Sequence, residues 1–269
     1  MLGSTKKKLF LWVNQSNGDS LGTIPVIENF IKKYPNVEIT FGCWEHHSYL
    51  FEHFPIKILK FGYDYRIGRS LRFDWYTPED HIPIYLWLGN YPNELGNNFH
   101  WKNCIINFNN QCRDKNIDFK LDYDCPGYIN LPNVEVSISN NSILVENGPP
   151  DTNSNRFHFD IMQIASKFPD ISFYCTGNAN CSLPNVFDLS IHNLIVVQNV
   201  LKKCKMFIGR GSGPAFLTAH EDCKNLVKGI FGDFSVFGKL WDPDDKNWYY
   251  NEGSTEAIIK FIEDKFNYE

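Results

Sequence analysis

The chain has 269 residues, of which 43% are hydrophobic and 16% aromatic, so it can bury a sizeable core and is not a disordered chain. Its net charge of −5 argues against a nucleic-acid backbone or an anionic membrane as the main partner, because both are usually bound through basic surfaces. No apolar run reaches the roughly 18 residues of a membrane span, and no signal peptide is evident, so we expect a cytoplasmic protein, or one of the host cytoplasm if viral.

The first half of the sequence predicts a unit of strand, loop, helix and strand. Residues 9–14 form a short apolar run that is typical of a buried parallel strand. Apolar residues at helical spacing over 24–31 predict a helix that ends at Tyr34-Pro35, and 37–43 predicts the next strand. Such a unit builds a parallel sheet through a right-handed crossover. Two further strands and a helix are predicted at 56–61, 84–88 and 99–115.

The second half repeats this alternation of strands and helices. Strands are predicted at 142–146, 171–175, 186–189, 206–208 and 226–231. Helices are predicted at 159–168, 194–203, 214–220 and 254–266, the last capped by Ser254. The alternation predicts an α/β protein with two doubly wound, Rossmann-like domains that face each other across a cleft, residues 1–135 and 136–269.

The first candidate site is the polar segment Asn17-Gly18-Asp19-Ser20, which follows the first predicted strand. Ligands of open α/β sheets bind where a strand ends and a helix begins. A carboxylate there can act as a general base on a hydroxyl group, so Asp19 is the catalytic candidate. The alternative interpretation is that Asp19 or Ser20 caps the following helix, as these residue types commonly do.

The second candidate site is the glycine-rich segment Arg210-Gly211-Ser212-Gly213-Pro214, which follows the strand at 206–208. Its glycines let the backbone approach a ligand closely, and the following helix would direct N–H groups and its dipole at an anion. Arg210 and Ser212 could add charge and a hydrogen bond, which suits a diphosphate. The alternative is a glycine-rich turn without a ligand.

A third segment follows the strand at 142–146 and contains Asn147 and Gly148, with Arg156 further on. A basic side chain here could reach a phosphate from the other side of the site, although the pattern by itself favours a surface loop with one solvated arginine. The histidines and the eight cysteines show no metal-ligand spacing, so we predict no metal site and read most of the cysteines as small core residues.

Together, these segments resemble glycosyltransferase family 9, the heptosyltransferase-like enzymes of lipopolysaccharide assembly. The opening order of Gly18-Asp19, Thr23, Pro25 and Tyr34-Pro35 is similar to that family's opening motif. The stretch from Asn185 to Ser190, followed by a helix and then by residues 207–214, is similar to its donor-binding region. The resemblance spans most of residues 9–232 and is weak in the middle.

The resemblance implies a GT-B fold whose C-terminal half binds a nucleotide-sugar donor and whose N-terminal half faces a glycan or another hydroxyl acceptor. It implies Asp19 as the base, Asn17, Gly18 and Ser20 on the acceptor side, and no cofactor or metal. The sequence departs from the family at Gly211, where the family usually has Asp, and at Phe216, where it usually has His. These departures leave open a catalytically silent protein that binds a nucleotide or a glycan.

Overall fold

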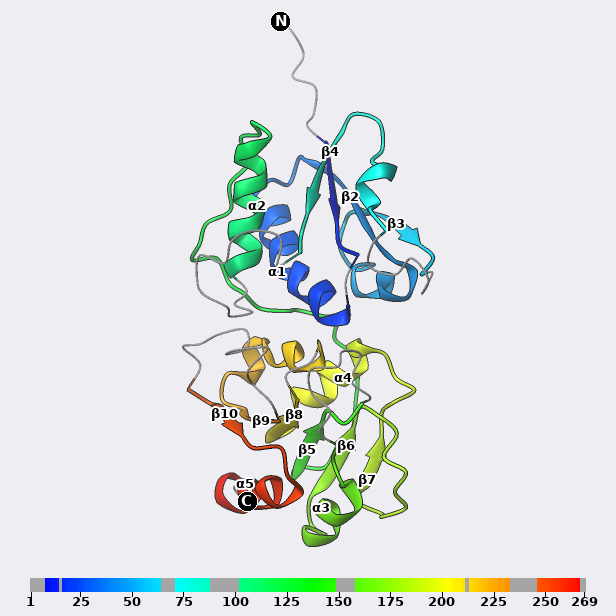
Figure 1. The fold of residues 1–269 in the computed structure, drawn as a ribbon, viewed down its shortest axis with the longest axis vertical. Coiled ribbons are helices and arrows are strands. Elements are labelled where there is room, and N and C mark those ends of the chain that lie inside the picture. The colour runs from blue at the N-terminus through cyan, green and yellow to red at the C-terminus, as the bar shows by residue number, and fades with distance from the viewer. Residues whose placement is uncertain are drawn as a thin grey trace, which may run out of the picture. The chain divides into compact units, whose positions relative to one another are not determined.

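The computed structural model describes residues 8–14, 16–63, 71–87, 102–148, 158–210, 213–232 and 246–266. The chain divides into two compact units, Met1–Asn130 and Leu131–Glu269 (Figure 1). The division falls slightly before the boundary that the sequence predicts after residue 135. Each unit is built on its own parallel sheet, as the alternation of strands and helices predicts.

In the first unit the described residues form a four-stranded parallel sheet in the order β3-β2-β1-β4. The strands are β1 (Lys8–Trp12), β2 (Glu38–Trp44), β3 (Lys57–Phe61) and β4 (His81–Tyr85). The α-helices are α1 (Asn17–Lys33) and α2 (Lys102–Asp114), and two short 3₁₀ helices are η1 (Glu45–Leu50) and η3 (Phe73–Tyr76).

Helices α1 and α2 cover one face of this sheet, and η3 lies over the other. The two α-helices meet through Phe30 and Phe108, whose rings pack edge to face with their centres 5.4 Å apart. On the opposite face, Phe10 and Trp12 of β1 pack with Trp44 and Phe73. All five predicted elements after the first strand are present, but the strand predicted at 84–88 begins earlier, at His81.

In the second unit the described residues form a six-stranded parallel sheet in the order β10-β9-β8-β5-β6-β7. The strands are β5 (Ser142–Val145), β6 (Ser172–Cys175), β7 (Val186–Asp188), β8 (Met206–Gly209), β9 (Val227–Phe231) and β10 (Trp248–Asn251). The α-helices are α3 (Ile161–Lys167), α4 (Leu194–Leu201) and α5 (Thr255–Lys265), and two 3₁₀ helices are η4 (Gly213–Thr218) and η5 (Glu221–Cys223).

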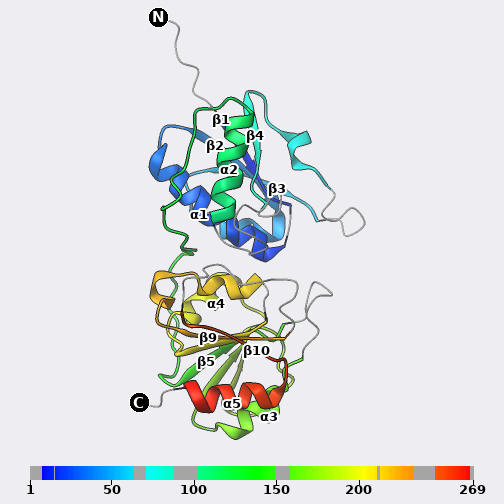
Figure 2. The ribbon, with the colours of Figure 1, turned by 60° about the vertical axis from the view of Figure 1, so that its left-hand side comes forward.

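Helices α3 and α5 pack together on one face of the second sheet, and α4 lies on the other (Figure 2). The core under α3 and α5 contains Ile143, Val145 and Ile208 from the strands, with Ile164 and Phe261 from the helices. Helix α5 begins where predicted, because the Ser254 hydroxyl accepts a hydrogen bond from the Ala257 N–H.

The sequence did not predict β10. The helix predicted at 214–220 is also wrong, because the chain forms the short 3₁₀ helix η4 instead. It ends before His220, whose backbone is extended and whose side chain caps η5 by accepting from the Asp222 N–H. A 3₁₀ helix of six residues carries less of the aligned dipole that a long α-helix would direct at an anion.

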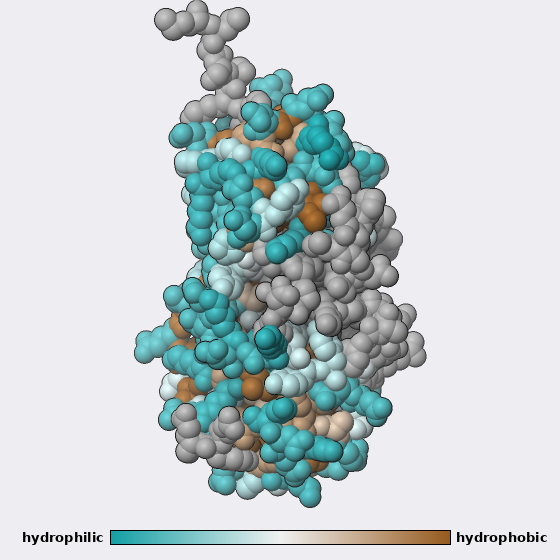
Figure 3. Space-filling model, turned by 90° about the vertical axis from the view of Figure 1, so that its left-hand side faces the viewer, coloured by the Kyte–Doolittle hydropathy of each residue, from teal (hydrophilic) through white to brown (hydrophobic). Residues whose placement is uncertain are grey.

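The surface in Figure 3 is mainly hydrophilic over its described residues, with apolar residues scattered between them. Within the described part of the chain, none of the helices combines the length and the apolar composition that a membrane crossing requires.

Candidate functional site

The candidate site of the second unit lies where the order of strands reverses. From the central strand β5 the chain continues to β6 and β7 on one side and then returns to β8 on the other. The carboxyl ends of β5 and β8 are therefore neighbours, and the Glu146 N–H donates to the Ile208 carbonyl at 2.8 Å. In open α/β sheets this reversal point is where ligands bind. Two of the predicted segments, around Asn147 and around Arg210, meet here.

The backbone after β5 is held against the end of β6. The Asn147 side-chain carbonyl accepts a hydrogen bond from the Gly177 N–H at 2.7 Å. A Cβ atom added at Gly177 would lie 2.6 Å from the Gly148 Cα, closer than real contacts allow. Only glycine therefore fits at position 177, and the sequence analysis missed this residue. The sequence does contain a signal for it, because a glycine two positions after a buried strand is typical of a close approach between backbones.

Arg210 is held by a buried ion pair with Glu146. The backbone N–H of Arg210 donates to Glu146 Oε2 at 3.0 Å, and its Nη2 donates to Oε1 at 3.3 Å. Arg210 is 2% exposed and Glu146 is 3% exposed, so the pair is enclosed. The Arg210 guanidinium also lies 5.9 Å from the centre of the Phe159 ring. The sequence predicts that Arg210 binds a phosphate. In the structure its positive charge is instead balanced by the Glu146 carboxylate.

The remaining donor-side candidates divide into described and undescribed residues. Gly213 and Pro214 open η4 and are half-buried. Pro214 has no N–H group, so it can preset the helical turn but cannot donate to a phosphate. Gly211, Ser212 and Arg156 lie outside the described residues.

In the first unit the strand order reverses between β1 and β4, and Asp19 lies at this point. The segment predicted as a loop is the first turn of α1, since Asn17 begins the helix. Asp19 Oδ2 accepts from the Ser16 N–H at 3.1 Å and from the Ser16 hydroxyl at 2.7 Å. Trp87, which follows β4, donates its indole N–H to Asp19 Oδ1 at 3.1 Å. The capping alternative thus describes the contacts of Asp19 in this structure.

The other acceptor-side candidates share this helical turn. Asn17 is half-buried and Gly18 is buried. Ser20 is fully buried, and its hydroxyl lies 3.0 Å from Nδ1 of the buried His47. Burial, together with the neighbouring His46, lowers the pKa of His47 to about 3. The Ser20–His47 pair therefore contains a neutral imidazole and anchors α1 to η1.

Among the described residues, no group of three or more His, Cys, Asp and Glu side chains is arranged to hold a metal ion. All eight cysteines are free thiols.

No protein-family model matches the chain. No curated protein matches it either.

Solved structures match nearly the whole chain. A family 9 glycosyltransferase from Veillonella parvula is 13% identical with a TM-score of 0.56, over 98% of this chain and 90% of the other. The E. coli heptosyltransferase WaaC, solved with ADP-2-deoxy-2-fluoro heptose, is 12% identical with a TM-score of 0.58, over 96% and 99%. A possible UDP-N-acetylglucosamine 2-epimerase from Listeria monocytogenes is 10% identical with a TM-score of 0.51, over 97% and 88%.

Such identities establish the fold and leave the activity to be argued from the residues. Two α/β units, each on a parallel sheet, and neighbours that include family 9 enzymes agree with the fold that the sequence predicts. The chain therefore has the two-unit α/β fold of the GT-B type, in the form found in heptosyltransferases of glycosyltransferase family 9.

Proposed function

We propose that the chain transfers a sugar from a nucleotide-diphosphate donor to a hydroxyl group of an acceptor. The observation that carries this proposal is the strand reversal of the second unit, where Asn147, Gly148 and Arg210 meet at the carboxyl edge of the sheet. The fold neighbour WaaC was solved with ADP and with an ADP-heptose analogue, which supports a nucleotide-sugar as the donor.

In this proposal the second unit binds the donor and the first unit binds the acceptor. The diphosphate lies against the backbone of residues 211–213, with Pro214 presetting the turn that follows and Arg156 as a further cation. Gly211 and Gly213 permit a close approach of the backbone to a ligand. Donors that are preorganised where charge develops stabilise the transition state more than the ground state.

Asp19 is the proposed base. A carboxylate has about four lone-pair sites, and three of those of Asp19 accept from Ser16 and Trp87. The remaining site, on Oδ1, is where an acceptor hydroxyl would donate. As Asp19 takes that proton, the acceptor oxygen attacks the anomeric carbon, and the bond from that carbon to the diphosphate oxygen breaks. The diphosphate leaves with the bonding electrons. No metal ion or other cofactor takes part.

The second candidate is a catalytically silent protein that binds a nucleotide or a glycan. The buried Glu146–Arg210 pair favours it, because it places a carboxylate beside the proposed diphosphate site and uses the charge of Arg210 internally. Because Arg210 already balances Glu146, the pair brings no net positive charge to stabilise a departing diphosphate.

A donor screen separates these candidates. We expect one of the ADP-, GDP- or UDP-sugars to raise the melting temperature and then to be turned over, with release of nucleoside diphosphate. The change Ser212→Asp should abolish that binding through repulsion of the phosphate, whereas Ser137→Asp, an exposed site before β5, should leave it intact. Binding without turnover supports the silent protein. Equal binding by the Ser212→Asp variant contradicts the proposed placement of the diphosphate.

A further inference from the structure

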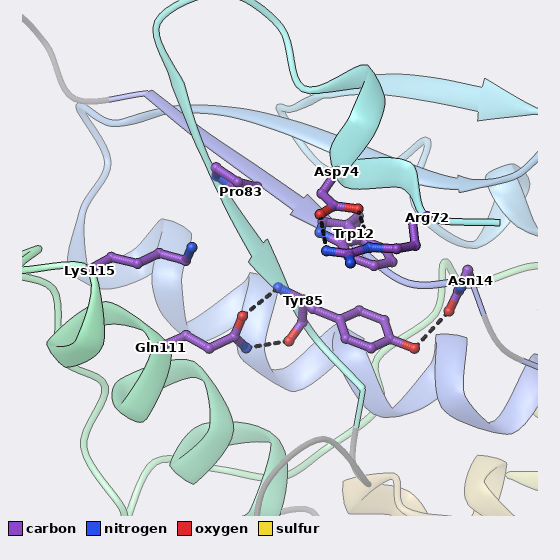
Figure 4. Close-up of a pocket in the computed structure, with 8 residues that line it drawn as sticks. All are labelled: Trp12, Asn14, Arg72, Asp74, Pro83, Tyr85, Gln111 and Lys115. Atoms are coloured by element: carbon purple, nitrogen blue, oxygen red, sulfur yellow. Dashed lines mark hydrogen bonds and ion pairs between the residues drawn. The ribbon is translucent and has the colours of Figure 1, made fainter. Parts of the chain in front are cut away.

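The first unit contains a cavity of about 440 Å³ that involves none of the proposed donor or catalytic residues. It lies along the edge strand β4, with Arg72 and Asp74 near η3 on one side and Gln111 and Lys115 from the end of α2 on the other (Figure 4). Its volume is within the range of about 300–1,000 Å³ that is typical of small-molecule sites. It is lined by Trp12, Asn14, Arg72, Asp74, Pro83, Tyr85, Gln111 and Lys115.

One wall of the cavity is aromatic and fixed in place. The rings of Trp12 and Tyr85 are stacked, with centres 4.0 Å apart and planes 16° apart. The Tyr85 hydroxyl donates to Asn14 Oδ1 at 2.7 Å, and the Asn14 amide donates to the Leu71 carbonyl at 2.8 Å. Because these bonds hold the wall before any ligand arrives, a ligand would not have to order it.

The other wall carries hydrogen-bonding groups of both kinds. Arg72 donates twice to the Asp74 carboxylate, at 3.1 and 2.5 Å, so the two charges balance. Arg72 keeps N–H donors beyond those two, and Asp74 keeps lone pairs. The Lys115 ammonium makes no ion pair with a described residue. The cavity thus offers donors and acceptors side by side with one unbalanced positive charge.

We propose that this cavity binds a saccharide unit. A sugar ring presents hydroxyl groups, which both donate and accept, to Arg72, Asp74 and Lys115, and a C–H face to the aromatic wall. The Gln111 amide already bonds the Tyr85 backbone N–H and carbonyl, so Arg72, Asp74 and Lys115 are the groups left to bind the ligand. A free phosphate would meet only one unbalanced cation. This proposal does not rest on the proposed glycosyl transfer.

The edge position of β4 explains why the cavity exists. Pro83 lies in this strand, as proline commonly does at a sheet edge, because it cannot donate a ladder hydrogen bond. The Gln111 side chain pairs with the Tyr85 backbone at this edge in place of another strand. The adjacent segment η3 also exposes Trp75, at 72%, so aromatic surface continues beside Asp74.

The test is a titration of the full chain with methyl glycosides of glucose, galactose, mannose and N-acetylglucosamine. Binding is monitored through the indole N–H signals in NMR spectra. Inorganic phosphate and AMP are titrated in parallel. We expect at least one glycoside to bind, and Lys115→Met and Arg72→Met each to weaken that binding at least tenfold. Arg72 is 61% exposed in its side chain and Lys115 is exposed, so neither change should unfold the chain.

The matched control is Lys57→Met, an exposed lysine on the opposite edge strand β3, which should leave glycoside binding unchanged. Ser212→Asp should also leave it unchanged, so a failure of the donor site is distinguishable from a failure of this proposal. Binding of phosphate or AMP without any glycoside, no binding at all, or equal glycoside affinity in the parent and both cavity variants would overturn the proposal.

Discussion

Asp19 is held in place by contacts with two parts of the first unit. Its carboxylate caps the first turn of α1 through Ser16 and joins the end of β4 through the indole of Trp87. The sequence offered the capping role as an alternative, because Asp and Ser commonly cap helices. It could not offer the contact with Trp87, since that contact crosses 68 residues of sequence.

Replacing Asp19 by Asn tests the proposed base. The amide oxygen can still accept from Ser16, but the amide nitrogen then faces the indole N–H, so we expect a loss of about 1 kcal/mol, or about 2–4 °C in melting temperature. Turnover should fall about 10²–10⁴-fold. Trp87→Phe is the matched control, since it removes the same hydrogen bond and keeps the carboxylate. Near-parental turnover by Asp19→Asn would leave Asp19 as a cap alone.

His47 should make the protein sensitive to acid. Burial lowers its pKa to about 3 in the folded state, whereas it titrates near 6.5 when unfolded. Between these values the unfolded state binds the extra proton, so stability is lost as the pH falls, by up to about 1.4 kcal/mol per unit. His47→Gln should flatten the dependence of unfolding free energy on pH between about 6.5 and 3, and the exposed His192→Gln should not. Parallel pH curves for the parent and His47→Gln would contradict this assignment.

At the scale of elements, the strands were more predictable than their connections. Buried parallel strands appear in a sequence as short apolar runs. The runs at 206–208 and 226–231 therefore predicted β8 and β9 closely. The end of η4 was not predictable from local pattern, because the His220 side chain caps a separate turn. Strand β10 (Trp248–Asn251) was not predicted, because its residues are half-exposed at the edge of the sheet and do not form a continuous apolar run.

The junction of β5 and β6 should not tolerate a side chain at position 177. Gly177→Ala would place a Cβ within 2.7 Å of the Gly148 backbone N, so the loop after β5 must shift. We expect a loss of about 1–3 kcal/mol in unfolding free energy and weaker donor binding. Gly62→Ala is the control, since nothing lies within 4 Å of its added Cβ. Unfolding curves that do not distinguish the two variants would show that the junction is not packed as described.

At the scale of the whole molecule, the reactivity of the cysteine thiols tests the packing of the cores of both units. Burial raises the pKa of five thiols to about 12 and also raises that of Cys104, which suppresses the reactive thiolate. The five are Cys43, Cys112, Cys175, Cys204 and Cys223. Only Cys125 and Cys181 are partly exposed. We expect a thiol reagent to modify at most two of the eight cysteines in the folded chain and all eight after unfolding. Rapid modification of more than two would contradict the described cores.

The central claim is that a nucleoside diphosphate binds where the strand order of the second unit reverses. Titrating the chain with ADP, GDP and UDP while following backbone amide signals in NMR spectra tests it directly. We expect the signals of Asn147, Gly148, Gly177, Arg210 and Gly213 to move together, at the carboxyl edge of the sheet, for at least one nucleotide. Signals that move instead at Asn141 and Lys205, beside the opposite ends of β5 and β8, or that do not move for any nucleotide, would contradict the account.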